Sequence, residues 1–225
     1  MNSLKSLFPL LLGIISVFIF SCSAESKVIW QIGKADNHAA EFALAPTRYK
    51  QFLKNDFGWE DRYFLIGQSD EQKDFPYVLP GPSDEWGGTW GTSGWRSHSL
   101  NILFGIDQLP KSEEWKLIID LFDINDKDST VFKVSINGKS WKYRLPKGSG
   151  KNSIEDSTSV GKEFVIEIPI ESKLIKMGGN EISLTTLQGS WLIFDHIRLE
   201  GSGNTQLTEI KKVFLRNVKA ANYEI

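Results

Sequence analysis

The chain has 225 residues, and its 26 lysines and arginines stand against 28 aspartates and glutamates, which gives a formal net charge of −2. The two signs are interleaved and form no basic stripe, which excludes nucleic acid as an expected partner. A single cysteine excludes disulfides within the chain. Eight tryptophans beside two methionines are more typical of a β-sandwich or a stacking surface than of a helical bundle.

The first segment, residues 1–22, has the pattern of a lipoprotein signal peptide. Lys5 precedes an apolar run over residues 7–20 that is too short for a comfortable membrane span. The small residue before Cys22 resembles a bacterial lipobox, in which the cysteine becomes the lipidated first residue. We therefore expect export and lipid anchoring through Cys22 to the bacterial cell envelope, at the outer membrane or in the periplasm. The alternative is an ordinary cleaved signal with a chance cysteine.

The next part of the chain predicts short strands and one short helix. An apolar strand is expected over residues 28–32 and a second extended piece over 40–44. A helix over 47–55, capped by Thr47, would carry Tyr49, Phe52 and Leu53 on one face. A strand over 62–67 leads into a long irregular region over 68–97, and a loop of that length inside a domain is usually functional or disordered.

From residue 99 onward the strand pattern is regular. Strands are predicted over residues 99–106, 115–122, 164–170, 180–187 and 191–200. A hairpin over 131–145 turns at Asn137-Gly138, a pair that suits the positive backbone angles of a type I′ turn. Many short strands with glycine turns predict an all-β jelly-roll sandwich over residues 28–201. Residues 202–225 are expected to be a linker and the truncated start of a further segment.

The segment over residues 86–98 is the strongest functional signal. Four glycines separate three indoles, an arginine and a histidine, so these side chains are expected on a loop and not inside regular structure. The predicted carbohydrate-binding residues are Trp86, Trp90, Trp95, Arg96 and His98. Flat indoles suit the C–H face of a sugar ring, and Asp84 or Glu85 would add hydrogen bonds. The alternative is that one or two of these tryptophans cap the end of the sandwich.

Several stretches together resemble one known domain. They are residues 29–42 (IWQIGKADNHAAEF), 63–69 (YFLIGQS) with Lys73-Asp74-Phe75, 134–138 (VSING), 179–182 (GNEI) and 194–201 (FDHIRLEG). In this order they resemble the carbohydrate-binding-like domain III of the rhamnogalacturonan lyases, polysaccharide lyase family 4. The resemblance implies a galactose-binding-like jelly roll attached to enzymes that cut pectin backbones. It implies no lyase activity here, because the catalytic lysine and histidine of that family belong to a separate domain without a matching segment in this chain.

A metal ion is expected only by analogy. Related jelly-roll modules, which the chain resembles at the level of the fold, often hold a structural calcium ion between their first and last strands, and Glu41 and Asp195 would supply carboxylates for it. A surface salt bridge is the alternative. The segment over residues 123–128 is interpreted as a solvated turn, since Lys127 stands where a calcium loop needs a ligand.

No catalytic residues are predicted. The three histidines show no metal-ligand spacing, and residues 67–71 fail the Gly-x-Ser-x-Gly pattern of a nucleophile elbow at its last position. The function expected is therefore non-catalytic recognition of a pectin-like plant cell-wall polysaccharide or oligosaccharide. A galacturonate ligand would favour Arg96 as a bidentate partner. The alternative is the remnant or N-terminal part of a polysaccharide lyase or glycoside hydrolase, with the domain as a structural accessory to a catalytic partner.

Overall fold

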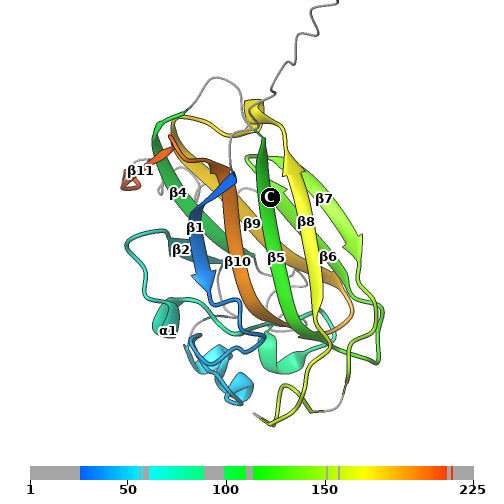
Figure 1. Ribbon diagram of the computed structural model, residues 1–225. Coiled ribbons are helices and arrows are strands. Elements are labelled where there is room, and N and C mark those ends of the chain that lie inside the picture. The colour runs from blue at the N-terminus through cyan, green and yellow to red at the C-terminus, as the bar shows by residue number, and fades with distance from the viewer. Residues whose placement is uncertain are drawn as a thin grey trace, which may run out of the picture.

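The computed structural model describes residues 26–55, 57, 61–88, 99–109, 114–150, 152–156, 158–211 and 214. Within these ranges the strands form two sheets that pack face to face as a sandwich (Figure 1). None of the helices in these ranges is long and apolar enough to cross a membrane. The predicted all-β jelly-roll sandwich is confirmed.

One sheet has five strands among the described residues, and all of its pairings are antiparallel. Its order is β1 (Ser26–Gly33), β10 (Leu192–Ser202), β5 (Trp115–Ile124) and β8 (Phe164–Ile170), with the short β3 (Val78–Leu79) also paired to β10. Pro169 of β8 faces Lys116 of β5 in the ladder. Because β8 stands last in the strand order, it is an edge strand, and it contains a proline.

The second sheet has six strands in the described part of the chain. Its order is β11 (Gln206–Thr208), β4 (Leu100–Gln108), β9 (Gly178–Gln188), β6 (Val131–Ile136) and β7 (Lys139–Arg144), and β2 (Arg62–Leu65) pairs with β4 in parallel. The short helical pieces are α1 (Glu71–Asp74) and the 3-10 turns Tyr49–Gln51, Leu53–Asn55, Glu85–Gly87 and Ser172–Leu174.

The core lies between the two sheets and follows from the alternation of side chains along each strand. In β6, Phe132, Val134 and Ile136 are fully buried, while the residues between them are only half-buried. Across the core, β5 and β10 contribute residues such as Leu117 and Leu199, which are fully buried. Each such side chain stabilises the fold by about 1.5–3 kcal/mol relative to an exposed position. The predicted turn at Asn137-Gly138 is also present, with positive φ at both residues.

The structure differs from the prediction over residues 47–55, where two 3-10 turns replace the expected helix. Tyr49 and Phe52 are both buried, and residues three apart lie on the same face of a 3-10 turn. Arg48, not Thr47, stands at the N-cap, and it makes no side-chain capping hydrogen bond. Packing against the core therefore decides the local conformation of this short segment.

Other segments also differ from the sequence prediction. The extended piece over 40–44 contributes only an isolated bridge between Ala43 and Pro76. The irregular region over 68–97 contains α1 and β3, and residues 206–208, which were assigned to a linker, form β11 beside β4. These added strands are two or three residues long, so they carry no readable periodicity.

Candidate functional site

An open groove of about 440 Å³ lies where loops meet at one end of the sandwich, in the size range of small-molecule sites. Figure 1 shows the loop that follows β1 and the loop that precedes β8 gathered at this end, the lower one in the view. The lining residues are Tyr49, Ser83, Asp84, Trp86, Asn125, Asp126, Lys127, Asp128, Gly150, Asn152, Ile154, Glu155, Ser190 and Trp191. Segments far apart in the sequence therefore build one concave surface.

Aromatic rings form one wall of the groove. Tyr49 and Trp86 meet edge to face, with ring centroids 4.9 Å apart, and Phe52 contacts the same indole at 6.0 Å. Because Tyr49 and Phe52 are buried, they fix the orientation of Trp86, which is itself half-buried. Edge-to-face pairs of this kind contribute about 0.5–1.5 kcal/mol beyond area burial. The indole of Trp86 is thus held rigidly while part of it stays open to the groove.

Asp84 ties the tryptophan-bearing segment to the turn between β9 and β10. One carboxylate oxygen accepts from the Ser190 hydroxyl at 2.6 Å and the other from the Gly81 amide at 2.8 Å. The Ser83 amide adds a backbone bond to the Gly189 carbonyl at 3.0 Å. Burial raises the pKa of Asp84 to about 6, although the hydrogen bond from Ser190 acts in the opposite direction.

Asp123, fully buried at the end of β5, organises a second wall of the groove. The donors to its two oxygens are the amides of Ile124, Ser149 and Lys162 and the hydroxyls of Ser149 and Ser153. These bonds hold the segment before β8 against the end of β5, and that segment supplies Asn152, Ile154 and Glu155 to the groove. The interpretation of residues 123–128 as a solvated turn is therefore wrong for Asp123, because the turn is anchored by a buried carboxylate.

In this wall the backbone packs so closely that two glycines have no room for a side chain. A Cβ atom on Gly148 would stand 1.7 Å from the Ile124 carbonyl oxygen, and one on Gly150 would stand 1.7 Å from the carboxylate carbon of Asp126. Gly150 also has a φ of 60°, a conformation that favours glycine. The loop that carries Asn152 and Glu155 therefore lies close against the turn that carries Asp126.

Carboxylates dominate the rim of the groove. Asp126 is half-buried, and Asp128 and Glu155 are exposed. Glu155 accepts a 2.5 Å hydrogen bond from the Tyr49 hydroxyl, which joins the aromatic wall to the loop that Asp123 positions. Burial and the hydrogen bond to Glu155 together raise the pKa of Tyr49 to about 12. The groove thus offers an aromatic surface beside acceptor-rich edges.

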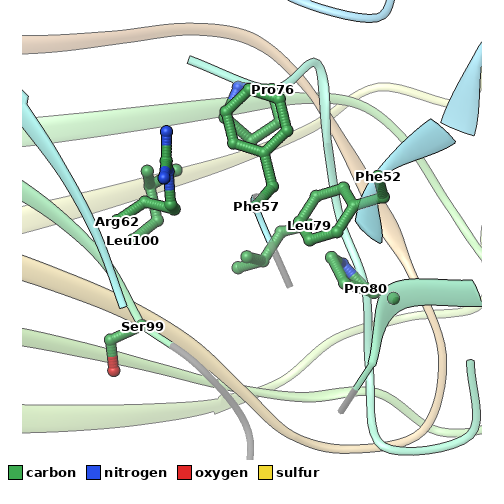
Figure 2. A pocket seen from close by; sticks show the side chains of 9 residues that line it. Phe52, Phe57, Arg62, Pro76, Leu79, Pro80, Ser99 and Leu100 are labelled. Carbon is green, nitrogen blue, oxygen red and sulfur yellow. The ribbon is translucent and has the colours of Figure 1, made fainter. Parts of the chain in front are cut away.

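Of the predicted carbohydrate-binding residues, the structure places Trp86 in the groove, together with the predicted auxiliary residue Asp84. Trp90, Trp95, Arg96 and His98 lie outside the described residues. A separate apolar pocket has a volume of about 10 Å³, and in it Phe52, Leu79 and Pro80 lie across from Arg62 and Leu100 (Figure 2). A volume of this size holds at most about one water molecule, so this pocket is not a ligand site.

Most residues that line the groove were not predicted as binding residues from the sequence. Tyr49 was expected only as one face of a helix, Asn125 as part of a solvated turn, and Glu155 was not singled out. Trp191, at the start of a predicted strand, is 6% exposed and also lines the groove. The one available signal was the concentration of glycine, serine and asparagine over residues 148–153, which is typical of a shaped loop.

The two residues predicted to hold calcium are already hydrogen-bonded. Glu41 accepts from the Lys34 amide at 2.5 Å, and Asp195 accepts from the His38 amide at 2.8 Å. Asp195 lies with Asp120 and His196 in a buried cluster on β5 and β10, and Glu41 is not a member of that cluster. The calcium ion stays a prediction.

The comparisons with known proteins agree with the sequence resemblance. A model of the CBM-like (carbohydrate-binding-module-like) domain III of polysaccharide lyase family 4 matches residues 28–199, from β1 into β10. A search of curated proteins found no match.

Solved structures with some similarity include carbohydrate-binding modules. A family 35 module from an environmental isolate is 19% identical, with a TM-score of 0.33 over 50% of this chain and 70% of that chain. The CBM35 from Cellvibrio japonicus Abf62 is 14% identical, with a TM-score of 0.33 over 51% and 72%. Xyl-CBM35, solved with a glucuronic acid-containing disaccharide, is 15% identical, with a TM-score of 0.33 over 51% and 72%.

Replacing Asp123 with asparagine is expected to lower the free energy of unfolding by about 3 kcal/mol, because an amide group offers one acceptor oxygen where the carboxylate offers two. Urea unfolding of the purified chain measures this loss. Asp128→Asn, an exposed change in the same turn, is the matched control and should cost less than about 0.5 kcal/mol. Equal stability of the two variants would contradict the anchoring role of Asp123.

The raised pKa of Asp84 predicts a pH-dependent penalty. The folded state binds the Asp84 proton more tightly than the unfolded state, so stability falls as pH rises from the ordinary value of 3.8 to about 6. Relative to Asp84→Asn, the wild type should lose about 2–3 kcal/mol between about pH 4 and about pH 7. Denaturant unfolding at both pH values measures the difference, with Asp107→Asn as a control for removing a negative charge. A stability difference that does not change with pH would contradict the assignment.

Proposed function

Since the chain belongs to the family of the CBM-like domain III of polysaccharide lyase family 4, we propose that its loop-end groove binds a polysaccharide without cleaving it. The observation that carries this proposal is the half-open indole of Trp86 beside a row of carboxylate and amide groups. The apolar face of a pyranose ring stacks on such an indole, and the polar groups receive its hydroxyls. Tyr49 and Phe52 keep the indole in place, so little ordering is needed when the ligand arrives.

The finer parts of the proposal rest on the sequence and on the family. The ligand is a pectin-like plant cell-wall polysaccharide, because segments such as residues 29–42 and 194–201 resemble a domain of rhamnogalacturonan lyases, which cut pectin backbones. The chain is exported by residues 1–22 and is held in the cell envelope by lipidated Cys22. There it serves a catalytic polysaccharide-degrading partner by keeping the substrate nearby, which raises the effective concentration of substrate at that enzyme.

Trp86→Ala is expected to weaken polysaccharide binding about tenfold or more, because it removes the stacking surface. Affinity electrophoresis on a panel of pectic polysaccharides measures this change. Trp141→Ala is the matched control: Trp141 is also half-buried and packed against the core, but it lies on β7 and does not line the groove. Melting temperatures of both variants separate lost binding from lost folding.

Retained binding in folded Trp86→Ala, or equal losses in both variants, would contradict the proposed site. Unsaturated products released from a pectic substrate by the purified chain would contradict the non-catalytic role and support the alternative of a lyase.

The lipid anchor is tested in a bacterial host that processes lipoproteins. The wild-type chain should incorporate labelled palmitate and partition with membranes, whereas Cys22→Ala should do neither, because no thiol remains to be acylated. Palmitate labelling that persists in Cys22→Ala, or membrane partitioning without labelling, would contradict an anchor at this residue.

A further inference from the structure

We infer that the groove selects uncharged sugar residues and rejects uronates. This inference rests on the proposed function and narrows its ligand, within a pectin-like polysaccharide, to neutral residues and away from free galacturonate. The negative charges that line the groove would repel a uronate.

The described lining of the groove is strongly acidic. Asp84, Asp126, Asp128 and Glu155 contribute carboxylates, and Lys127 is the one cationic side chain among the described lining residues. The acids come from three separate segments of the chain, and all of them line the same groove. Because the chain as a whole is nearly balanced in charge, this is a local concentration of negative charge.

The carboxylates are close enough to affect neighbouring groups. After burial, the negative charge of Asp128 is among the causes that raise the pKa of Asp84. The charges of Glu155 and Asp84 likewise help to raise the pKa of Tyr49 in the aromatic wall. A further anion in the groove would meet the same repulsion, which is stronger beside a partly buried surface than in open water.

Hydrogen-bond chemistry favours the same ligand class. An ionised carboxylate only accepts hydrogen bonds, and a sugar hydroxyl can donate to it in a charge-assisted bond. A uronate carboxylate has no proton to donate and carries the same sign of charge. Arg96, the predicted partner of a galacturonate, lies outside the described residues, and the described lining contains no arginine. The hydroxyls of a neutral ring stacked on Trp86 can donate hydrogen bonds to the carboxylates of the groove. A uronate ring would instead bring its own carboxylate close to those carboxylates.

The test compares two oligosaccharides of the same length that differ only at C6: an oligogalacturonate, which carries carboxylates, and its carboxyl-reduced form, which carries neutral hydroxymethyl groups. Neutral galacto- and arabino-oligosaccharides are added as further uncharged probes. Calorimetry at low salt, with a chelator present, should show the best uncharged probe binding at least about tenfold tighter than the oligogalacturonate. The difference between the two affinities should become smaller at high salt, because screening weakens the repulsion between the carboxylates.

The Asp126→Asn/Asp128→Asn double variant should bind the oligogalacturonate about threefold or more tighter than the wild type does, because two like charges are removed. Asp107→Asn is the matched control, since Asp107 is an exposed acid near the far end of β4 and does not line the groove. It should leave both affinities unchanged. An equal gain in the control would overturn the assignment of the selectivity to the groove.

Two results separate this inference from the proposed function. An oligogalacturonate that binds as tightly as the uncharged probes, with or without added calcium, would overturn the inference and leave polysaccharide binding intact. Binding of this strength that appears only with added calcium would mean that a cation bridges the carboxylates of ligand and groove, and it too would overturn the inference. If no probe of either kind binds, the proposed function falls and the inference falls with it.

Discussion

The buried carboxylate of Asp123 is the interaction on which the shape of the groove depends. Its two oxygens gather backbone and hydroxyl donors from the end of β5 and from the segment before β8, which brings Asn152 and Glu155 to the rim. Buried carboxylates are costly unless they are fully hydrogen-bonded, and this one is. The groove is therefore formed before any ligand arrives, so binding need not pay to order these loops.

Most of the sandwich could be predicted because its strands carry their own signal. Alternating side chains placed β8 at residues 164–170 as observed, and the turn between β6 and β7 was readable from Asn137-Gly138. Strands β3 and β11 were not predictable, since two or three residues form a strand only beside a suitable partner. The 3-10 turn at Tyr49 was missed for a related reason, because packing and not propensity sets it.

The candidate site was predicted only in part, because its parts meet through tertiary structure. Trp86 was recognisable from its glycine-rich surroundings, whereas the bond between Tyr49 and Glu155 joins residues 106 positions apart. The burial of Asp123 was not predicted, since all of its hydrogen-bond donors are backbone amides and serine hydroxyls, which leave no sequence signature. A sequence shows which side chains suit sugar chemistry, but the fold decides which acids stand beside them.

The edge strands of the sandwich affect how copies of this chain interact when they are crowded together. Figure 1 shows β7 and β8 on the same side, where each ends its sheet among the described strands. Pro169 deprives β8 of one backbone donor, and the exposed cations Lys139, Lys142 and Arg144 follow one another along β7. Prolines and like charges at such borders discourage a neighbouring chain from extending the ladder. Densely displayed copies can thus avoid edge-to-edge aggregation and remain separate particles.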